Sequence, residues 1–396
     1  MNIGDNMYDV IVIGAGPSGM MASVIASQKG LKVLLIDKNA EVGRKLKLTG
    51  GGRCNLTNLK KTNELVNVIH QGKTLYSALT SFSSEDIYNF FSDAGVELQV
   101  EDNDRVFTKR GNALELIQVL KNMLSDVTIM YNTTVTDINY GSNKEVITTD
   151  GTYKTRNIVI ATGGKSYPQT GSTGDGYKFA KKAGHTIEKL YPAETYIVTK
   201  DKFDLAGLTI NVSVKYENKT STGSMLFTHV GLTGPAIFNL SEFINKDLLT
   251  NKEVKIHIDY LPKFSIEALT NEIRDTDGSL EIRSWLKNFI PVKLAEYILG
   301  SLKSTKIASL SKANIDFIVS NIKNMPVSVI KTGTLEEAIV TSGGVCVKEI
   351  NPKTMESKLE PGLFFAGEVL DIHGPMGGYN LTVAFTSGYA VGQSIT

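Results

Sequence analysis

The segment formed by residues 8–37 constrains the fold more than any other part of the sequence. A short and almost wholly apolar run at residues 8–13 is typical of a buried parallel strand. A glycine-rich turn, an apolar stretch of helical length and a second apolar run that ends at Asp37 follow in that order. The glycines of the turn are Gly14, Gly16 and Gly19. This order predicts a βαβ unit that binds a dinucleotide, and a purely structural glycine turn is the alternative.

Each part of this unit has its own task in holding a dinucleotide. The first glycine permits a tight turn, the second lets a pyrophosphate approach the backbone, and the third lets the helix pack closely on the strand. Phosphate groups then meet free N–H groups at the positive end of the helix. Asp37 can accept hydrogen bonds from a ribose diol, and its charge disfavours a 2′-phosphate. The neighbouring residues that we expect to contact the cofactor are Ala15, Ser18 and Lys38.

Three later features favour FAD over NAD as the dinucleotide. An apolar strand at 157–163 ends in Ala-Thr-Gly, as found where a second segment crosses beneath a flavin nucleotide, and a strand at 363–368 ends in an acid suited to a ribityl hydroxyl. The helix that starts at 377–380 offers N–H groups to the flavin N1–O2 edge, where negative charge grows on reduction. Each feature alone could be an ordinary βα turn. The expected contacts are Ala161, Thr162, Gly163, Gly367, Glu368, Gly377, Gly378, Tyr379 and Asn380.

The segment 38–58 is expected to be a loop that adds further cofactor contacts. Its basic residues could neutralise the pyrophosphate, with solvated loop charges as the alternative. Cys54 could approach the flavin or be a small packed residue. With Val135 from the alternating segment further on, the expected contacts are Arg44, Lys45, Gly51, Gly52, Arg53, Cys54 and Asn55.

Three residues are candidates for a catalytic role. His373 lies in the loop just before the helix that we expect to face the flavin, and His229 follows a strand, where a loop-fixing role is the alternative. Tyr167 precedes Pro168 and could cover the flavin face or sit in an ordinary turn. The other histidines are dispersed, and the two cysteines form no CxxC, so we expect no metal site and no dithiol redox pair.

Glycine is unevenly placed, and this predicts the division of the chain. Only seven of the 36 glycines lie in residues 191–335, and close backbone approach to a ligand needs glycine. We therefore expect an FAD-binding domain formed by residues 1–190 and 336–396, with residues 191–335 as an inserted substrate or lid domain. In that insert we expect antiparallel strands at about 196–260 and 326–341 and a helical subdomain at about 263–322.

The predicted fold class is α/β. It is a Rossmann-like FAD-binding domain with a mainly parallel sheet, interrupted by an inserted β-barrel-like domain that carries the helical subdomain. Residues 63–125 are expected to be mainly helical. From residue 128 to residue 160 apolar and polar residues alternate with a period of two, which is typical of strands.

The charge composition limits the classes of binding partner that we expect. Lys plus Arg is 42 and Asp plus Glu is 41, for a net charge of +1. This balance argues against nucleic acid or an anionic membrane as the main partner, because both attract a basic excess. No apolar run reaches the length of a membrane span, and the N-terminus leads straight into a strand. We expect a cytoplasmic protein with a small-molecule substrate; the oligomeric state stays open.

Several sequence blocks also resemble known flavoproteins. The N-terminal unit, 161–163 and 367–368 resemble the large superfamily of FAD proteins with two dinucleotide-binding-type halves. A narrower resemblance, to the BaiN-like, aminoacetone-oxidase-like flavoprotein family, extends from about residue 7 to the C-terminus. It is carried by residues 50–58, 161–176, 227–235 and 367–380. The resemblance implies an FAD domain split by an insert, in a family described variously as enone-type reductases of steroid-like acids or amine oxidases.

These observations predict an FAD-dependent oxidoreductase with non-covalent FAD, in which hydride passes between flavin N5 and a small organic substrate. One form of this hypothesis is an NAD(P)H-dependent reductase of an enone-like substrate. The alternatives are an amine oxidase that uses oxygen and an FAD-bound sensor without turnover. Because the sequence holds no second strand–GxGxxG–helix unit, a nicotinamide donor would have to be transient and to enter the same cavity as the substrate.

Overall fold

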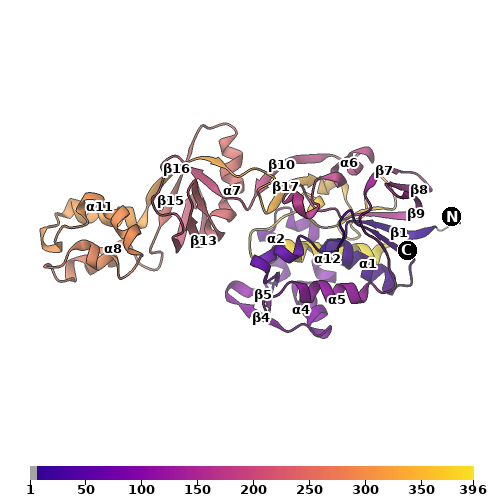
Figure 1. The fold of residues 1–396 in the computed structure, drawn as a ribbon, viewed down its shortest axis with the longest axis horizontal. Helices are drawn as coiled ribbons and strands as arrows, with labels where there is room; N and C mark the ends of the chain where they lie inside the picture. The colour runs from indigo at the N-terminus through magenta and orange to yellow at the C-terminus, as the bar shows by residue number, and fades with distance from the viewer. Residues whose placement is uncertain (1–6) are drawn as a thin grey trace. The chain divides into compact units, whose positions relative to one another are not determined.

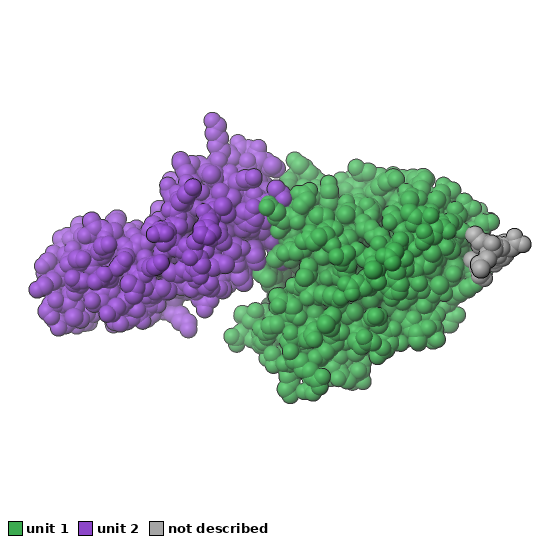
Figure 2. All heavy atoms as spheres, in the orientation of Figure 1, with its two compact units in different colours: residues 1–191, 335–396 green, residues 192–334 purple. Residues whose placement is uncertain are grey.

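The computed structural model describes residues 7–396 and divides into two compact units (Figures 1 and 2). Unit 1 is Met1–Tyr191 with Leu335–Thr396, and unit 2 is Pro192–Thr334. The expectation that the chain leads straight into its first strand rests partly on residues 1–6, which lie outside the described residues. No helix within residues 7–396 is both long and apolar enough to cross a membrane.

Unit 1 is built on a mainly parallel sheet to which both ends of the chain contribute, which confirms the predicted fold class. Strand β1 (Tyr8–Ile13) lies between β2 (Val33–Ile36) and β9 (Gly151–Ile160) and is parallel to both. The other strands are parallel β6 (Thr128–Met130) on β2, parallel β18 (Leu363–Phe365) on β9, and antiparallel β8 (Lys144–Thr148) and β7 (Val135–Asn139) at one edge. Residues 363–365 therefore end beside residues 158–160.

The first and last helices of the chain pack against each other in unit 1 (Figure 1). They are α1 (Pro17–Gln28) and α12 (Tyr379–Ser394). A Cβ at Gly388 would lie 2.4 Å from the carbonyl oxygen of Ser18, so this close approach requires glycine. The contact places the N-terminus of each helix in the same unit as the ends of β1 and β9.

The segment between β2 and β6 differs from the prediction. Residues 38–58 are not all loop, and residues 63–125 are not all helical, because a three-stranded antiparallel sheet forms from β3 (Asn55–Asn58), β5 (Arg105–Thr108) and β4 (Leu98–Glu101). These strands are four residues long and partly polar, and β3 pairs with a segment far along the chain. The helices of this region are α2 (Thr62–Val68), α3 (Tyr76–Ser81), α4 (Ser84–Asp93) and α5 (Leu114–Met123).

Unit 2 combines a closed six-stranded barrel with a group of helices. The barrel strands, in order around it, are β11 (Ile197–Thr199), β14 (Gly231–Thr233), β13 (Lys219–Phe227), β12 (Thr209–Tyr216), β15 (Val254–Asp259) and β16 (Met325–Thr332). Helix α7 (Pro235–Leu248), which was not predicted, packs on β13. The remaining helices are α8 (Ile266–Asp275), α9 (Ile282–Leu286), α10 (Val292–Leu299) and α11 (Lys312–Lys323).

The strands expected at 326–341 do not all belong to the barrel. Strand β16 ends at Thr332, and the next strand, β17 (Val340–Val345), pairs instead with β10 (Ile187–Ala193) in unit 1. A Cβ at Gly343 would lie 2.3 Å from the carbonyl oxygen of Lys189. Backbone packing of this closeness suits unit 1 and explains why a glycine pair occurs in the strand.

Candidate functional site

The glycine turn after β1 has the shape that a pyrophosphate needs. Gly14 has φ +103°, and a Cβ there would lie 2.5 Å from the carbonyl oxygen of Ala161 at the end of β9. A Cβ at Gly19 would meet the Gly14 carbonyl oxygen at 1.9 Å, whereas a Cβ at Gly16 would enter open space. Gly16 caps α1 without a side-chain hydrogen bond, so the first N–H groups of this helix have no side-chain cap. The turn thus offers backbone donors beside an open space, which fits a phosphate group.

Asp37 is held rigidly beside this turn. Its Oδ2 accepts a hydrogen bond from the N–H of Ala15 at 2.6 Å, and its Oδ1 accepts from the N–H of Asn39 at 2.8 Å. Arg44 donates to Oδ1 of Asn39 at 2.9 Å. Oδ1 also accepts from the side-chain amide of Asn39 at 2.9 Å, so Oδ2, with its second lone pair, is the oxygen through which Asp37 can still accept from a ribose diol.

Two other predicted contacts lie around Asp37. Lys38 forms an ion pair with Asp175 at 2.6 Å, so the structure gives this lysine a protein partner. The N–H of Thr133, two residues before Val135, donates to the carbonyl oxygen of Asp37 at 3.1 Å. The start of β7 therefore lies at the same end of the sheet as Asp37, for which we predict a ribose contact.

Glu368 gathers donors from several segments of unit 1. Its Oε2 lies 2.7 Å from Nζ of Lys45, and its Oε1 accepts from the N–H of Thr341 at 2.9 Å and from the hydroxyl of Ser166 at 3.2 Å. A Cβ at Gly163 would lie 3.9 Å from Oε2. The carboxylate follows β18, the strand after which we predict a ribityl contact, and it lies near the segment that follows β9. Its contact with Lys45 gives that lysine a protein partner.

The N-terminus of α12 places a glycine cap next to the buried side-chain oxygen of Asn55. Gly377 and Gly378 have φ of +138° and +93°, and Gly378 caps the helix without a side-chain hydrogen bond. Oδ1 of Asn55 is buried without a hydrogen-bond partner among the described residues, and a Cβ at Gly378 would lie 3.0 Å from it. A flavin pyrimidine edge carries acceptors at N1 and O2 and a donor at N3, so it would satisfy both the helix amides and this orphaned oxygen. The residues present therefore fit FAD.

The loop 49–55 is shaped by backbone rather than by reactive side chains. Gly51 and Gly52 have φ of +69° and +90°, and buried Cys54 has φ +57°. Burial raises the pKa of the Cys54 thiol to about 12, so it stays protonated and acts as a packed residue. Arg53 pairs with Glu101 and lies over the ring of Phe107, which directs it toward the three-stranded sheet.

The three catalytic candidates belong to two different units of the chain. His373 is buried in unit 1, whereas His229 is exposed in a tight turn between β13 and β14 of unit 2. Tyr167 has φ +55° and lies just before a short 3-10 turn in unit 1. The histidine that does join His373 is His70, whose ring centroid lies 4.9 Å away. No sequence signal links two residues so far apart, and His70 was not predicted. Among the described residues, no group of three His, Cys, Asp or Glu could hold a metal ion.

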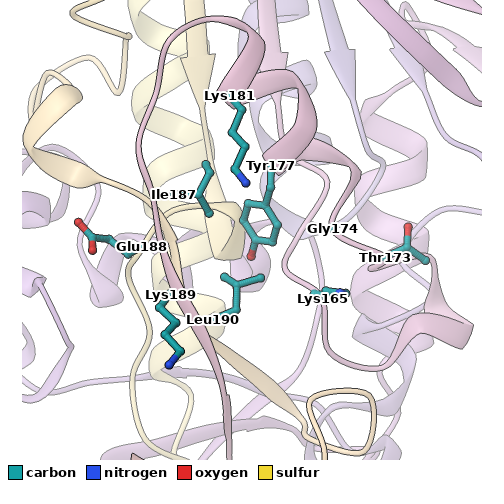
Figure 3. A pocket seen from close by; sticks show the side chains of 9 residues that line it. All are labelled: Lys165, Thr173, Gly174, Tyr177, Lys181, Ile187, Glu188, Lys189 and Leu190. Carbon is teal, nitrogen blue, oxygen red and sulfur yellow. The ribbon is translucent and has the colours of Figure 1, made fainter.

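A pocket of about 340 Å³ lies between α6 (Asp175–Lys182) and β10 (Figure 3). The ring of Tyr177 lines it, and three lysines surround it with one glutamate. The charged residues are Lys165, Lys181, Lys189 and Glu188. Burial and the carboxylates of Glu368 and Asp371 raise the pKa of Tyr177, so this residue stays a neutral phenol. The excess of positive charge suits an anionic group.

The parallel sheet, the glycine turn before α1 and the glycine cap of α12 fit an FAD-dependent oxidoreductase, and the chain is an enzyme of that class. Residues 8–394 match the HI0933-like protein Rossmann domain family, and the chain belongs to this family. The match covers both segments of unit 1 and the whole of unit 2.

Relatives and solved structures agree with this assignment. The chain is similar to the ribosomal RNA dihydrouridine synthases of Haemophilus influenzae (31% identical) and Escherichia coli (30%), each over 98% of both chains. It is 28% identical to the 3-dehydro-bile acid delta(4,6)-reductase of Clostridium scindens, over 98% of this chain and 99% of the other. The fold is similar to that of a 3-ketosteroid delta1-dehydrogenase from Sterolibacterium denitrificans, with TM-score 0.53, 15% identity, and coverage of 98% and 99% of the two chains.

Proposed function

We propose that the protein uses bound FAD to reduce a C=C bond conjugated to a carbonyl group. The observation that carries this proposal is the N-terminus of α12, where uncapped N–H groups lie beside the orphaned acceptor of Asn55. Such donors stabilise an electron-rich flavin, which is the state that a reductase must hold ready for its substrate.

The names of the full-length relatives support the choice of bond. Making dihydrouridine saturates the C5=C6 bond of uracil, which is conjugated to the C4 carbonyl, and a 3-dehydro-bile acid delta(4,6)-reductase acts on double bonds conjugated to a ketone. These two substrates differ in size and polarity but share one reacting group. The C=C bond conjugated to a carbonyl group is therefore the best-supported part of the proposal.

In the proposed reaction, different residues of the chain bind different parts of the cofactor. When bound, the flavin supplies the hydride. The turn Gly14–Gly19 holds the pyrophosphate, Asp37 accepts from the ribose, and Glu368 accepts from the ribityl chain. The amides at the start of α12 stabilise negative charge at the pyrimidine edge, and Asn55 fixes the orientation of that edge through its free Oδ1.

As the substrate we propose uridine in ribosomal RNA, because two relatives matched over 98% of their length carry that activity in their names. The net charge of +1 argued against nucleic acid, but net charge does not describe how charge is distributed. The lysines around the pocket by α6 provide a local basic surface in unit 1. A steroid-like enone is the second candidate, favoured by the bile-acid reductase.

The electron donor that we propose is NAD(P)H, which must leave before the substrate enters because the sequence has no second dinucleotide-binding unit. This order of binding predicts parallel lines when initial rates are plotted against both substrates. Lines that converge, or a complex that holds nicotinamide and substrate together, would contradict it.

One anaerobic experiment separates the functions under consideration. The purified holoenzyme is mixed with NADH, NADPH or candidate amines while flavin absorbance is followed, and reduced enzyme is then mixed with unmodified ribosomal RNA, a 3-oxo-4-ene steroid acid or air. Reduction by a nicotinamide and reoxidation by RNA, with dihydrouridine detected by mass spectrometry, supports the proposal. Reduction by amines with reoxidation only by air indicates an amine oxidase. A flavin that no compound reduces indicates a sensor.

A further inference from the structure

We infer that Asp371, His70 and His373 form a proton relay, with His373 as the group that protonates the substrate carbon next to the carbonyl. The inference rests on the proposed function, because reduction of a conjugated C=C bond consumes one hydride and one proton. His373 is then the catalytic residue, and His70 and Asp371 are positioning residues that act through it.

The three residues differ in their exposure to solvent. The side chain of His70 is 42% exposed, whereas Asp371 and His373 are buried, each with 6% of the residue exposed. Nε2 of His70 lies 3.4 Å from Oδ1 of Asp371, and the two imidazole rings are 4.9 Å apart at a tilt of 34°. The half-exposed ring of His70 thus lies directly against the buried ring of His373, and the proposed relay runs from solvent through His70 to His373.

Backbone contacts fix this arrangement. The N–H of His70 donates to the carbonyl oxygen of His373 at 2.8 Å, which ties the segment after α2 to the loop before α12. That loop is closed by Asn380, whose side chain accepts from the N–H of Gly374 at 2.8 Å and donates to its carbonyl oxygen at 2.9 Å. The loop ends at Gly377 and Gly378, so His373 is only a few residues from the helix start that fits the flavin.

The chemistry balances with one mobile proton. The substrate gains a hydride, supplied by the reduced flavin, at one carbon and a proton from the His373 imidazolium at the other, so the C=C π bond is lost and two C–H bonds form. Neutral His373 then recovers its proton from His70, which takes one from solvent. Asp371, with Oδ1 3.4 Å from Nε2 of His70, is the carboxylate that faces this pair of rings.

Other ionisable groups near the relay do not compete for this role. Tyr177 lies within the influence of Asp371 and Glu368, and its raised pKa keeps it neutral. Burial, with contributions from Asp104 and Glu64, also raises the pKa of Tyr379, the first residue of α12. His185 shows what a structural histidine looks like in this protein: its two ring nitrogens lie 3.1 Å from Glu349 and 2.7 Å from Ser357, with no second histidine beside it.

The test compares His373→Gln, His70→Gln and Asp371→Asn with the control His257→Gln, a half-buried histidine of the barrel. Reoxidation of prereduced holoenzyme by uridine-containing RNA or by a 3-oxo-4-ene steroid acid is measured against pH. We expect His373→Gln to lose about 100-fold or more in this rate, while FAD affinity and reduction by NAD(P)H stay within about twofold. His70→Gln should lose about tenfold, and Asp371→Asn should move the pH profile toward lower pH because the charged imidazole has lost its counterion.

A second measurement needs neither flavin nor substrate. In apoprotein with ¹³C-labelled histidine, removal of His70 should change the pH dependence of the His373 ring signals, because the two ring centroids lie 4.9 Å apart. If the variants keep the wild-type rates and pH profiles, or if the two histidines titrate independently, the relay is wrong. If no enone or RNA reoxidises wild-type reduced enzyme while the NMR coupling is present, the proposed function fails but the coupled pair remains.

Discussion

Nζ of Lys45 lies 2.7 Å from Oε2 of Glu368, a residue 323 positions further along the chain. The two side chains are only 24% and 21% exposed, so the pair is partly shielded from solvent. It joins the segments of unit 1 that lie on either side of unit 2 in the sequence. The carboxylate is therefore held in one orientation by protein contacts, as the ribityl contact that we propose for it requires.

Glu368→Gln should weaken FAD binding. The amide keeps the shape of the side chain but loses the charge that orders Lys45 and Ser166, and hydrogen bonds to a charged group contribute about 1.5–3 kcal/mol. We expect the Kd of apoprotein for FAD, measured by flavin fluorescence quenching, to rise by about 10- to 100-fold. Glu253→Gln, which removes a surface partner of Lys200, is the control and should leave the Kd unchanged. An unaltered Kd in Glu368→Gln would mean that the carboxylate does not contact the cofactor.

Gly378→Ala should displace the start of α12 by a clash with the backbone of β3. A Cβ there would lie 2.4 Å from the carbonyl oxygen of Thr57, and the residue has φ +93°. The start of α12 must then shift, and loss of its donors should slow substrate reduction on the order of 100-fold. Gly30→Ala is the matched control, because Gly30 has φ +81° but open space around its Cβ position. Stopped-flow measurement of flavin reoxidation distinguishes the two, and equal losses in both variants would assign the effect to backbone strain alone.

The parts of the site that follow from local sequence could be predicted. The turn Gly14–Gly19 and Asp37 lie within one βαβ unit, and the end of β18 carries its own pattern of an apolar run before Gly367 and Glu368. Each of these signals needs only a strand period and a glycine at a position of positive φ or close approach. The structure brings them to one end of one sheet.

The parts that depend on contacts between distant segments could not be predicted. His70 becomes a candidate only through its contacts with Asp371 and His373, and Asn55 only through its closeness to Gly378. In both cases the partners are hundreds of residues apart in the sequence. Strand β3 is short and polar, so its sequence shows no alternation of apolar and polar residues that would predict a strand. Only the pairing with β5, far along the chain, makes it one. The pattern of β17 shows a strand but not which sheet it joins.

Charge reversal of the lysines around the pocket should show whether the substrate is RNA or a small molecule. The triple variant Lys165→Glu, Lys181→Glu, Lys189→Glu replaces three possible phosphate contacts with three repulsive charges. We expect KM for ribosomal RNA to rise and the slope of log KM against log salt to fall by about three, with no change for a steroid enone. Lys293→Glu, Lys303→Glu, Lys312→Glu makes the same charge change on exposed residues of unit 2. Equal effects of the two triple variants would show that the pocket has no special role.

Acid should destabilise unit 1 locally through His185. Burial lowers the pKa of this imidazole below its ordinary value of 6.5, with the nearby Glu349 opposing the shift only in part. Between the folded and the unfolded pKa the unfolded chain binds more protons, so the free energy of unfolding rises with pH in that window and is lost as pH falls below about 6.5. Hydrogen exchange of peptides that cover β17 and β18, measured from pH 7.5 to 5.5, should show this loss near Phe365, whose ring centroid lies 4.9 Å from that of His185. His185→Gln should flatten the dependence, whereas His257→Gln should leave it as in the wild type. A wild-type slope that survives in His185→Gln would assign the acid sensitivity to another group.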